Sequence, residues 1–286
     1  MPDASPTAAA WPWETGILDP QGPIAAAEKT ILFNATSVML GVIIPVIVLT
    51  IVFAWWFRAS NTRAIHLPEW SYSGGIELVV WSIPTLVVVF LGGIAWIGSH
   101  ELDPAKAIPS NVTPIKVQVV SMDWKWLFIY PELGVASLNR LAVPAGTPIS
   151  FQLTSSSVMN SFFVPQLGSQ IYTMSGMVTR LNLMADKPGD YPGLSAQFSG
   201  DGFSDMRFNV NALDAAGFDA WLAATRAGGG MLDAAAYADL VRPSADVAAK
   251  TFGGVAPHLF ESAVGLQSPM TGMQPGPASP AITGGQ

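Results

Sequence analysis

The chain has 286 residues, which is enough for one soluble domain and a membrane part. Half of the residues are hydrophobic and only 12% are charged, so the composition excludes an ordinary soluble enzyme. The formal net charge of −7 argues against a nucleic-acid partner, and the absence of cysteine excludes disulfides, thiolate metal ligands and a cysteine nucleophile.

Residues 1–30 come first and are rich in Pro and Ala. Trp11 and Trp13 lie in this segment. Because tryptophan prefers the membrane–water interface, we expect an irregular segment near the membrane surface. A partly disordered tail is the alternative. The N-terminus has no basic stretch followed by an apolar one, so either a signal peptide lies outside this sequence or the first span inserts unaided.

Two charge-free apolar runs follow, residues 31–57 and residues 78–97. As helices they would be about 40 Å and 30 Å long, against roughly 30 Å of hydrocarbon in a bilayer. Pro45 is expected to kink the first run, and Pro84 lies in the first turns of the second. Tryptophans near the run ends fit interfacial anchors. The sequence therefore predicts a transmembrane helical hairpin over residues 31–100.

The charges around the two runs predict their orientation. The short link 58–77 carries two Arg and two Glu, whereas residues 1–30 carry one Lys and four acidic residues. Residues 98–110 carry one Lys and two acidic residues. Because loops rich in Lys and Arg remain in the cytoplasm, the link is predicted to be cytoplasmic and both chain ends to lie outside.

From residue 112 the pattern changes to alternation. Ile115, Val117 and Val119 alternate with polar residues, which is typical of a strand. Short apolar runs separated by Pro and Gly predict further strands at residues 124–130, 138–143, 148–154, 161–164, 178–184, 190–198 and 205–210. Many short strands with regular turns predict a sandwich or a barrel.

The last part of the chain is predicted to be helical. Residues 215–226 and 231–241 are Ala-rich with apolar residues at helical spacing, and the glycines at 228–230 divide them. They form a predicted C-terminal helical extension over residues 211–260. Residues 267–286 contain Gly, Pro and Ser with almost nothing apolar to bury, so we expect a disordered tail.

The Gly-rich stretch 189–206 carries the most informative spacing. Ser195, Ser199, Phe203 and Met206 stand at intervals of four, four and three. This spacing resembles Cys-x3-Cys-x3-His-x2-Met, the ligand loop of the binuclear copper centre in subunit II of the haem-copper oxidases.

A second segment, residues 158–162, resembles the Val-x-His-Ser-Trp segment of the same family, with Asn160 at the position of the other histidine ligand. The resemblance implies a copper loop that has lost its ligands. Copper is held by thiolate and imidazole, which are soft or borderline donors. Here serines occupy the thiolate positions, an asparagine and a phenylalanine occupy the imidazole positions, and a glutamine stands where a backbone carbonyl would serve. A lone methionine thioether does not hold a copper pair, so we expect no metal. The vestigial copper-ligand positions are Asn160, Ser195, Gln197, Ser199, Phe203 and Met206.

Three longer stretches resemble one branch of the family in particular. They are residues 119–131 (VVSMDWKWLFIYP), 157–165 (SVMNSFFVP) and 167–172 (LGSQIY). They look like subunit II of the cytochrome bo-type ubiquinol oxidases, which take electrons from quinol in the membrane instead of from cytochrome c. The resemblance extends from about Leu18 to Phe260.

This resemblance implies a cupredoxin-like Greek-key sandwich over residues 111–210, after a membrane hairpin of two transmembrane helices and before a short C-terminal helical extension. It implies a non-catalytic subunit II of a proton-pumping terminal oxidase, which couples ubiquinol oxidation to the reduction of oxygen to water. The complex would lie in the bacterial inner membrane, with the N-terminus and the C-terminal domain of this chain on the periplasmic side.

The expected partners follow from the same resemblance. The main one is oxidase subunit I, which would hold the haems and copper, whereas no cofactor is expected in this chain. The other expected partners are further small membrane subunits, ubiquinol bound by the complex, and membrane lipid. Neither cytochrome c nor nucleic acid is expected to bind.

Glu77 stands one residue before the second apolar run. The segment 75–81 (GIELVVW) resembles the family segment whose glutamate opens a proton-uptake route into subunit I. The resemblance therefore implies that Glu77 helps to form a proton-uptake entrance. The alternative is a carboxylate that is simply favoured at a helix N-terminus by the helix dipole.

Other candidate residues receive structural interpretations. Trp124 and Trp126 occupy a segment that accepts electrons from cytochrome c in copper-bearing relatives, but without copper we expect them to pack in the sandwich. Flexible filling of the core, and not a copper site made of methionine alone, is expected of Met159, Met174, Met177, Met184 and Met206. No metal spacing joins the three histidines, His66, His100 and His258. We find no catalytic residues in the sequence.

Two other functions remain open at this point. A membrane-tethered periplasmic module for electron transfer or copper carriage would need metal ligands that this sequence lacks. A membrane-tethered binding module unrelated to respiration would not purify with a haem protein, so co-purification distinguishes it from an oxidase subunit.

Overall fold

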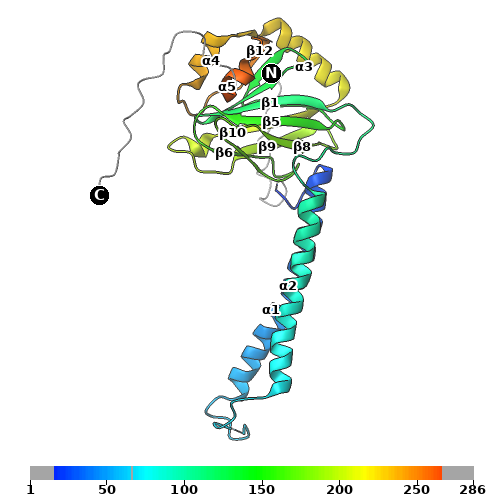
Figure 1. The fold of residues 1–286 in the computed structure, drawn as a ribbon, viewed down its shortest axis with the longest axis vertical. Helices are drawn as coiled ribbons and strands as arrows, with labels where there is room; N and C mark the ends of the chain where they lie inside the picture. Colours follow the sequence, from blue (N-terminus) through cyan, green and yellow to red (C-terminus); the bar gives the residue numbers. More distant parts are fainter. Residues whose placement is uncertain (1–15, 66, 266–286) are drawn as a thin grey trace, which may run out of the picture.

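Two long apolar helices stand side by side and carry a β-sandwich at one end (Figure 1). The first helix, α1 (Pro23–Trp56), runs away from the sandwich, and the second, α2 (Gly74–Glu101), returns to it. This computed structural model describes residues 16–65 and 67–265. The predictions for Trp11, for Trp13, for His66 and for the tail 267–286 lie outside the described residues.

Both helices have the length and composition of membrane spans. Their most apolar windows have mean hydropathies of 2.8 and 2.3, and no residue of either window is buried inside the chain. At 1.5 Å per residue, helices of 34 and 28 residues are about 51 and 42 Å long, against roughly 30 Å of hydrocarbon. The predicted hairpin of two apolar helices is therefore confirmed, and each helix extends beyond the hydrocarbon.

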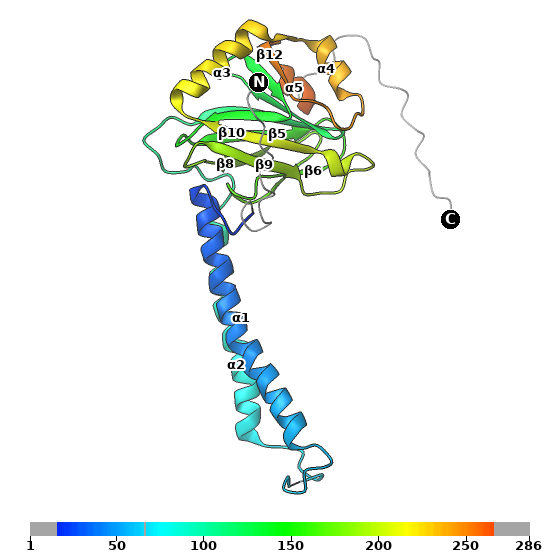
Figure 2. The same ribbon diagram turned by 180° about the vertical axis from the view of Figure 1, so that it is seen from behind.

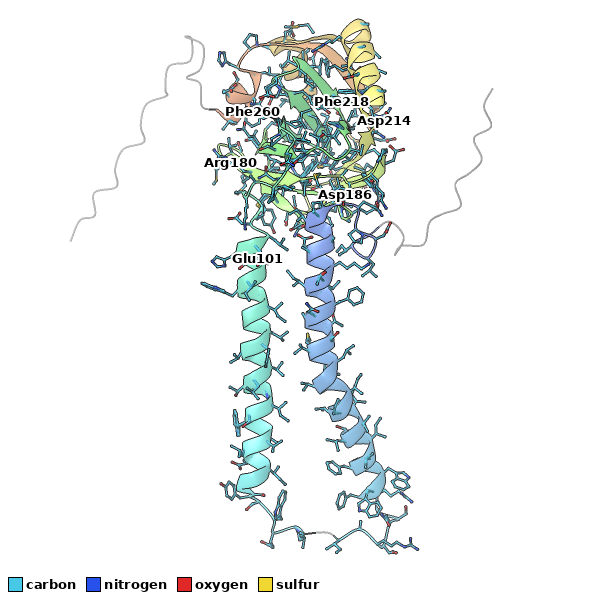
Figure 3. The ribbon with its side chains drawn as sticks, turned by 90° about the vertical axis from the view of Figure 1, so that its right-hand side faces the viewer. Glu101, Arg180, Asp186, Asp214, Phe218 and Phe260 are labelled. Atoms are coloured by element: carbon cyan, nitrogen blue, oxygen red, sulfur yellow. The ribbon has the colours of Figure 1, made fainter. Side chains whose placement is uncertain are left out.

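The first helix starts earlier than the sequence suggested. α1 begins at Pro23, within the segment 1–30 that was expected to be irregular. Proline is favoured at the first helical position because its missing N–H needs no partner there, and the alanines that follow have high helix propensity. Pro45 lies inside α1, where it removes a backbone hydrogen bond, and Figure 3 shows α1 bending along its length.

Two sheets form the sandwich. One has seven strands in the order β11-β12-β3-β2-β1-β5-β8, and the other has five in the order β4-β10-β9-β6-β7. Both are mixed, because β1 pairs in parallel with β5 and β10 pairs in parallel with β4. The seven-stranded sheet contains β1 (Ile115–Met122), β2 (Lys125–Tyr130), β3 (Val135–Leu138), β5 (Ile149–Ser155), β8 (Thr179–Leu183), β11 (Gly230–Leu232) and β12 (Lys250–Val255). The five-stranded sheet contains β4 (Arg140–Pro144), β6 (Asn160–Phe163), β7 (Ile171–Thr173), β9 (Gly189–Ser195) and β10 (Arg207–Leu213).

An aromatic cluster fills the space between the sheets. The rings of Phe162 and Phe208 stack with centroids 4.9 Å apart, and Trp126 meets the Phe162 ring edge-on at 5.4 Å. All three side chains are buried. Burying such rings contributes much of the stability of a sandwich, with each close aromatic pair adding about 1 kcal/mol. The expectation that Trp126 packs in the core is met by this arrangement.

The C-terminal segment covers the outer face of the seven-stranded sheet. It contains α3 (Ala215–Gly228), α4 (Ala234–Val241) and α5 (Leu259–Val264), which lie at the end of the molecule away from the hairpin (Figure 2). Helices α4 and α5 bury a second apolar cluster against the outer face, whereas Trp221 of α3 packs against the cluster between the sheets, with its ring centroid 5.4 Å from that of Tyr130. Leu259 and Phe260 of α5 pack there with Val120 and Leu127 of the sheet. The extension is thus part of the sandwich's packing.

The predicted sandwich is confirmed, but β3, β7, β11 and β12 were not predicted. Strands of three or four residues are too short to show an alternating pattern. The longer β12 (Lys250–Val255) is held by antiparallel pairing with β3, a contact between distant parts of the sequence. The sequence predicted a helical extension over residues 211–260. The structure has helices there, but it also has the strands β11 and β12.

The start of the second C-terminal helix is also different. Met231 and Leu232 were predicted as helix but belong to β11, and α4 begins only after Asp233. The Asp233 side chain accepts a hydrogen bond from the backbone N–H of Ala236 at 2.8 Å, which caps the helix. The cap explains why the helix starts there.

A tight joint connects the hairpin to the sandwich. The backbone N–H of Gln21 donates to the carbonyl of Gln166 at 2.8 Å, and the N–H of Asp186 donates to the carbonyl of Gln21 at 2.8 Å. A Cβ at Gly22 would lie 2.2 Å from the Met184 carbonyl oxygen, so the two backbones are in direct contact. The hairpin is thus fixed to the sandwich by backbone contacts as well as by the chain itself.

Candidate functional site

The vestigial copper-ligand positions lie on two segments that meet at one end of the sandwich. Asn160 opens β6, and Ser195 closes β9. The loop 196–206 connects β9 to β10 and contains one short 3-10 turn, Phe203–Asp205. Because β6 and β9 are paired, with Phe162 opposite Ser195, the sheet itself brings the two segments together.

Three of the six positions form one hydrogen-bonded group. The Ser195 hydroxyl donates to the Asn160 side-chain oxygen at 3.1 Å and lies 3.3 Å from the Gln197 carbonyl oxygen. The Asn160 amide donates to the Val158 carbonyl at 3.3 Å. Asn160 and Ser195 are both buried. Each polar atom therefore has a protein partner, and the group is stable without any ligand.

Ser199 and Met206 form a second pair. The Ser199 hydroxyl lies 3.9 Å from the Met206 sulfur, and the Ser195 N–H donates to the Met206 carbonyl at 3.1 Å. Phe203 differs from these residues, because its ring packs edge-on against Phe198 at 5.6 Å. The structure thus brings together five of the predicted positions, whereas the side-chain contact of Phe203 is with Phe198, which is not one of them.

The sequence did not indicate a set of hydroxyl groups behind these positions. The Thr173 hydroxyl lies 3.3 Å from the Asn160 carbonyl oxygen and 2.7 Å from the Ser121 hydroxyl. Ser121 and Thr173 are fully buried. A run of Ser and Thr at residues 154–157 was the available hint, but the partners come from other strands, so the sequence could not show the network.

The side chains at this site do not fit a copper pair. They offer hydroxyl, amide and a single thioether group, whereas a copper pair of this kind is held by thiolate and imidazole donors. The Asn160 and Ser195 polar atoms are already paired with each other, so a metal would have to break those bonds. Within residues 16–65 and 67–265, no group of three or more His, Cys, Asp or Glu is placed to hold a metal.

Glu77 lies at the other end of the molecule. It is in the first turn of α2, at the end of the hairpin remote from the sandwich (Figure 1). It is exposed and lines an open groove of about 620 Å³ with Tyr72, Trp81, Ser82 and Thr85. Its carboxylate forms no ion pair or hydrogen bond within the described part of the chain.

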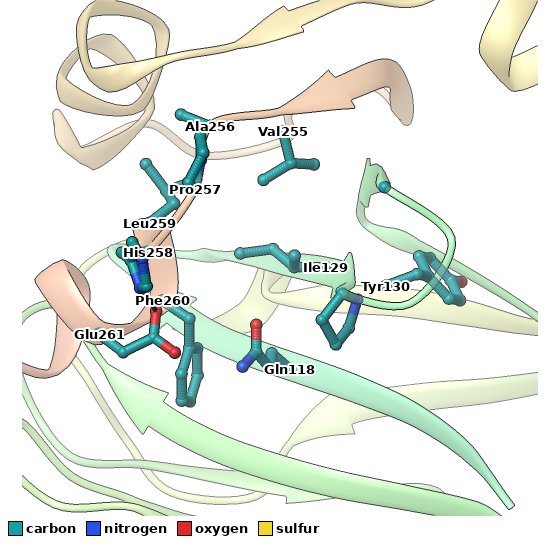
Figure 4. Close-up of a pocket in the computed structure, with 12 residues that line it drawn as sticks. Gln118, Ile129, Tyr130, Val255, Ala256, Pro257, His258, Leu259, Phe260 and Glu261 are labelled. Carbon is teal, nitrogen blue, oxygen red and sulfur yellow. Dashed lines mark ion pairs between the residues drawn. The ribbon is translucent and has the colours of Figure 1, made fainter.

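A smaller pocket lies between the seven-stranded sheet and the C-terminal segment. It has a volume of about 170 Å³, and Gln118, Ile129 and Phe260 are among the side chains around it (Figure 4). His258 and Glu261 lie at its edge with 4.0 Å between ring nitrogen and carboxylate oxygen. No vestigial position and no predicted proton-uptake residue lines this pocket.

Family models match most of the extramembrane part. The model "Cytochrome C oxidase subunit II, periplasmic domain" matches residues 133–213, and the model "COX Aromatic Rich Motif" matches residues 226–266. The cytochrome bo(3) ubiquinol oxidase subunit 2 of Pseudomonas aeruginosa is 49% identical over 244 residues, which cover 85% of this chain and 74% of the relative. The chain belongs to the ubiquinol oxidase subunit 2 family.

Other members of the family agree. Ubiquinol oxidase subunit 2 of Acetobacter aceti is 47% identical over 88% of this chain and 82% of its own length. The cytochrome bo(3) ubiquinol oxidase subunit 2 of Buchnera aphidicola subsp. Baizongia pistaciae is 53% identical over 68% of each chain. The chain is therefore a membrane-anchored subunit of a multi-subunit terminal quinol oxidase, and its sandwich is the cupredoxin-like domain of the haem-copper oxidases.

Proposed function

We propose that this chain is a copper-free subunit that takes no direct part in electron transfer. The observation that carries the proposal is the set of vestigial positions, which meet at one end of the sandwich but offer only hydroxyl, amide and thioether groups. The Ser195 hydroxyl donates to the Asn160 side chain, and the Asn160 amide donates to the Val158 carbonyl, so both buried side chains have partners without a metal. The chemistry of the site is that of an ordinary polar core.

The hairpin is proposed to brace subunit I. Large apolar side chains are exposed along both helices in the isolated chain, among them Leu78 and Val88. Lipid covers part of this surface, and a membrane subunit such as subunit I is the natural cover for the rest. On this proposal the haems and copper belong to subunit I, and the sandwich faces the periplasm above it.

Glu77 is proposed to form part of a proton-uptake entrance. Supporting this, the carboxylate is exposed at the end of the hairpin away from the sandwich, which is the cytoplasmic side if the sandwich is periplasmic. Ser82 and Thr85 line the same groove, so polar groups continue from Glu77 toward the membrane interior. An ionisable residue on a membrane helix is by default a candidate for a proton path.

Metal analysis of the purified full chain tests the central proposal. The chain is produced without subunit I, supplied with copper, and freed of excess metal before its copper content is measured. We expect less than stoichiometric copper and no copper-thiolate absorption. Stoichiometric copper that stabilises the chain against heat would contradict the proposal, because metal that binds only the folded state must raise its stability. The electron-transfer alternative would then be favoured.

A further inference from the structure

One short turn contacts three separate segments of the domain. The turn connects β1 to β2, and its side chains Asp123, Trp124 and Lys125 each point to a different neighbour; we name these three residues the β1–β2 turn. The loop 196–206 is one of the neighbours. The other two are the segment before Asn160 and the C-terminal extension.

Asp123 holds the segment that leads to Asn160. Its carboxylate accepts a short hydrogen bond from the Ser157 hydroxyl. The adjacent residue, Ser156, donates a backbone hydrogen bond from its N–H to the Ser121 carbonyl at 2.9 Å. Since Ser157 is three residues before Asn160, these bonds fix the approach of the vestigial position to the sheet.

Trp124 holds the loop itself. Its indole N–H donates to the Ser199 carbonyl at 3.1 Å. A Cβ at Gly202 would lie only 2.4 Å from the ring, so the glycine backbone rests directly on the indole. Trp124 has a φ of 63°, a left-handed conformation that is uncommon for a bulky residue. Such strain persists only where the surrounding contacts hold it in place.

Lys125 holds the C-terminal extension. It is 1% exposed, and its ammonium group donates to the Arg242 carbonyl at 2.7 Å and to the Ser244 hydroxyl. Neither acceptor is a carboxylate. Asn139 supplies a second connection, because its side-chain oxygen accepts from the Trp126 N–H at 2.8 Å and its amide donates to the Val247 carbonyl at 2.7 Å.

We propose that the β1–β2 turn provides the support that metal ligation would otherwise give to the loop 196–206, and that it couples this loop to residues 242–247 of the C-terminal extension. A metal centre cross-links the segments that carry its ligands. In this chain the cross-links are the carboxylate, indole and ammonium groups of three consecutive residues. The inference rests on these contacts alone and does not depend on the role of Glu77 or on the path of electrons.

Hydrogen exchange of the full chain in lipid nanodiscs, followed by mass spectrometry, tests the coupling. Trp124→Phe keeps an aromatic ring but removes the N–H that binds the Ser199 carbonyl. Lys125→Met keeps the length of the side chain but removes its charge and donors. A lost hydrogen bond of this kind speeds local exchange roughly tenfold, since about 1.4 kcal/mol corresponds to a factor of ten.

We expect Trp124→Phe to speed exchange in residues 196–206. Lys125→Met should speed it in residues 242–250 and also, through the turn, in residues 196–206. Arg242→Ala is the matched control, because Lys125 contacts only its carbonyl and its guanidinium forms just an exposed ion pair with Asp239. This control should exchange like the wild type in both regions.

Two results would overturn the proposal. One is Lys125→Met with faster exchange only in residues 242–250, because the turn would then not couple the two regions. The other is Trp124→Phe with unchanged exchange in the loop. If Lys125→Met does not fold, Ser244→Ala removes one exposed acceptor of the same ammonium group and should give the smaller change in the same two regions.

Discussion

Glu77 and Lys125 are ionisable side chains in opposite surroundings. Glu77 is exposed at the remote end of the hairpin and has no partner among the described residues, whereas Lys125 is buried beneath the C-terminal extension and bonded to two neutral acceptors. Replacing Glu77 removes no hydrogen bond or ion pair within the described residues. Replacing Lys125 removes two hydrogen bonds to the C-terminal extension. Their substitutions should therefore affect different measurements.

Glu77→Ala should lower turnover and leave assembly unchanged. The side chain makes no packing contact in the core, so the haem content of the purified oxidase should match the wild type. If Glu77 collects protons for the complex, quinol-oxidase turnover should fall by about tenfold, equivalent to ~1.4 kcal/mol in the barrier. Glu77→Asp should recover part of the rate because it restores a carboxylate. Unchanged turnover of Glu77→Ala across pH would return Glu77 to the alternative of a helix-end carboxylate.

Lys125 should make the stability of the domain depend on pH. Burial lowers the pKa of Lys125, with a smaller opposing effect from Asp123, while the unfolded chain keeps a value near 10.5. Between the lowered pKa and 10.5 the unfolded chain binds more protons than the folded chain, so the free energy of unfolding rises with pH. Lys125→Met has no ionisable group at this position, so it lacks this rise of the free energy of unfolding with pH.

The measurement is thermal unfolding of both full chains as the pH is raised from neutral toward 10.5. The wild type should gain stability relative to Lys125→Met over that range. The matched control, Lys187→Met, makes the same substitution at an exposed lysine. A constant difference for Lys125→Met would contradict the prediction.

At the scale of elements, the loop 196–206 and the start of β6 bring several of the vestigial positions together. Ser195 and Asn160 are within hydrogen-bond distance, and Ser199 lies 3.9 Å from the Met206 sulfur. We propose that the backbone of the loop can still place restored ligands around a metal pair. Phe203 is the exception, because its ring is held by Phe198.

Restoring the ligands should therefore restore copper. The variant carries Asn160→His, Ser195→Cys, Gln197→Glu, Ser199→Cys and Phe203→His. It should bind copper, turn purple and melt at a higher temperature with metal than without, because the metal binds only the folded loop. The same variant without Phe203→His shows whether that side chain must leave Phe198. A folded variant without copper would mean that the loop or its outer-shell support has changed.

The sequence predicted the elements that have a strong local pattern. The two apolar runs became α1 and α2, and the four-four-three spacing located the loop that the fold brings to Asn160. Short strands and distant contacts could not be predicted in this way. Lys125 and the Arg242 carbonyl are 117 positions apart, and nothing local in either segment indicates the other. The support of the site is non-local, whereas the vestigial positions follow a local spacing.

At the scale of the whole molecule, the close contact in the joint between hairpin and sandwich predicts that a larger residue at Gly22 destabilises the chain. Gly22→Ala would place a methyl group 2.2 Å from the Met184 carbonyl oxygen, so one backbone has to move. Such overpacking costs about 1–3 kcal/mol and should lower the melting temperature of the full chain. Gly92→Ala is the matched control, because nothing lies within 4 Å of its added methyl group and alanine favours a helix. An equal melting temperature for Gly22→Ala and the wild type would contradict the prediction.

Because the hairpin is long, a small rotation at this joint displaces its far end by several ångströms. The hairpin is joined to the sandwich at this end, and Glu77 lies about 36 Å along α2 from Glu101 at 1.5 Å per residue. Each degree of rotation at the joint displaces Glu77 by about 0.6 Å, and five degrees displace it by about 3 Å, the length of one hydrogen bond. A small change of angle at the joint would therefore be enough to make or break a contact at the Glu77 end of the hairpin.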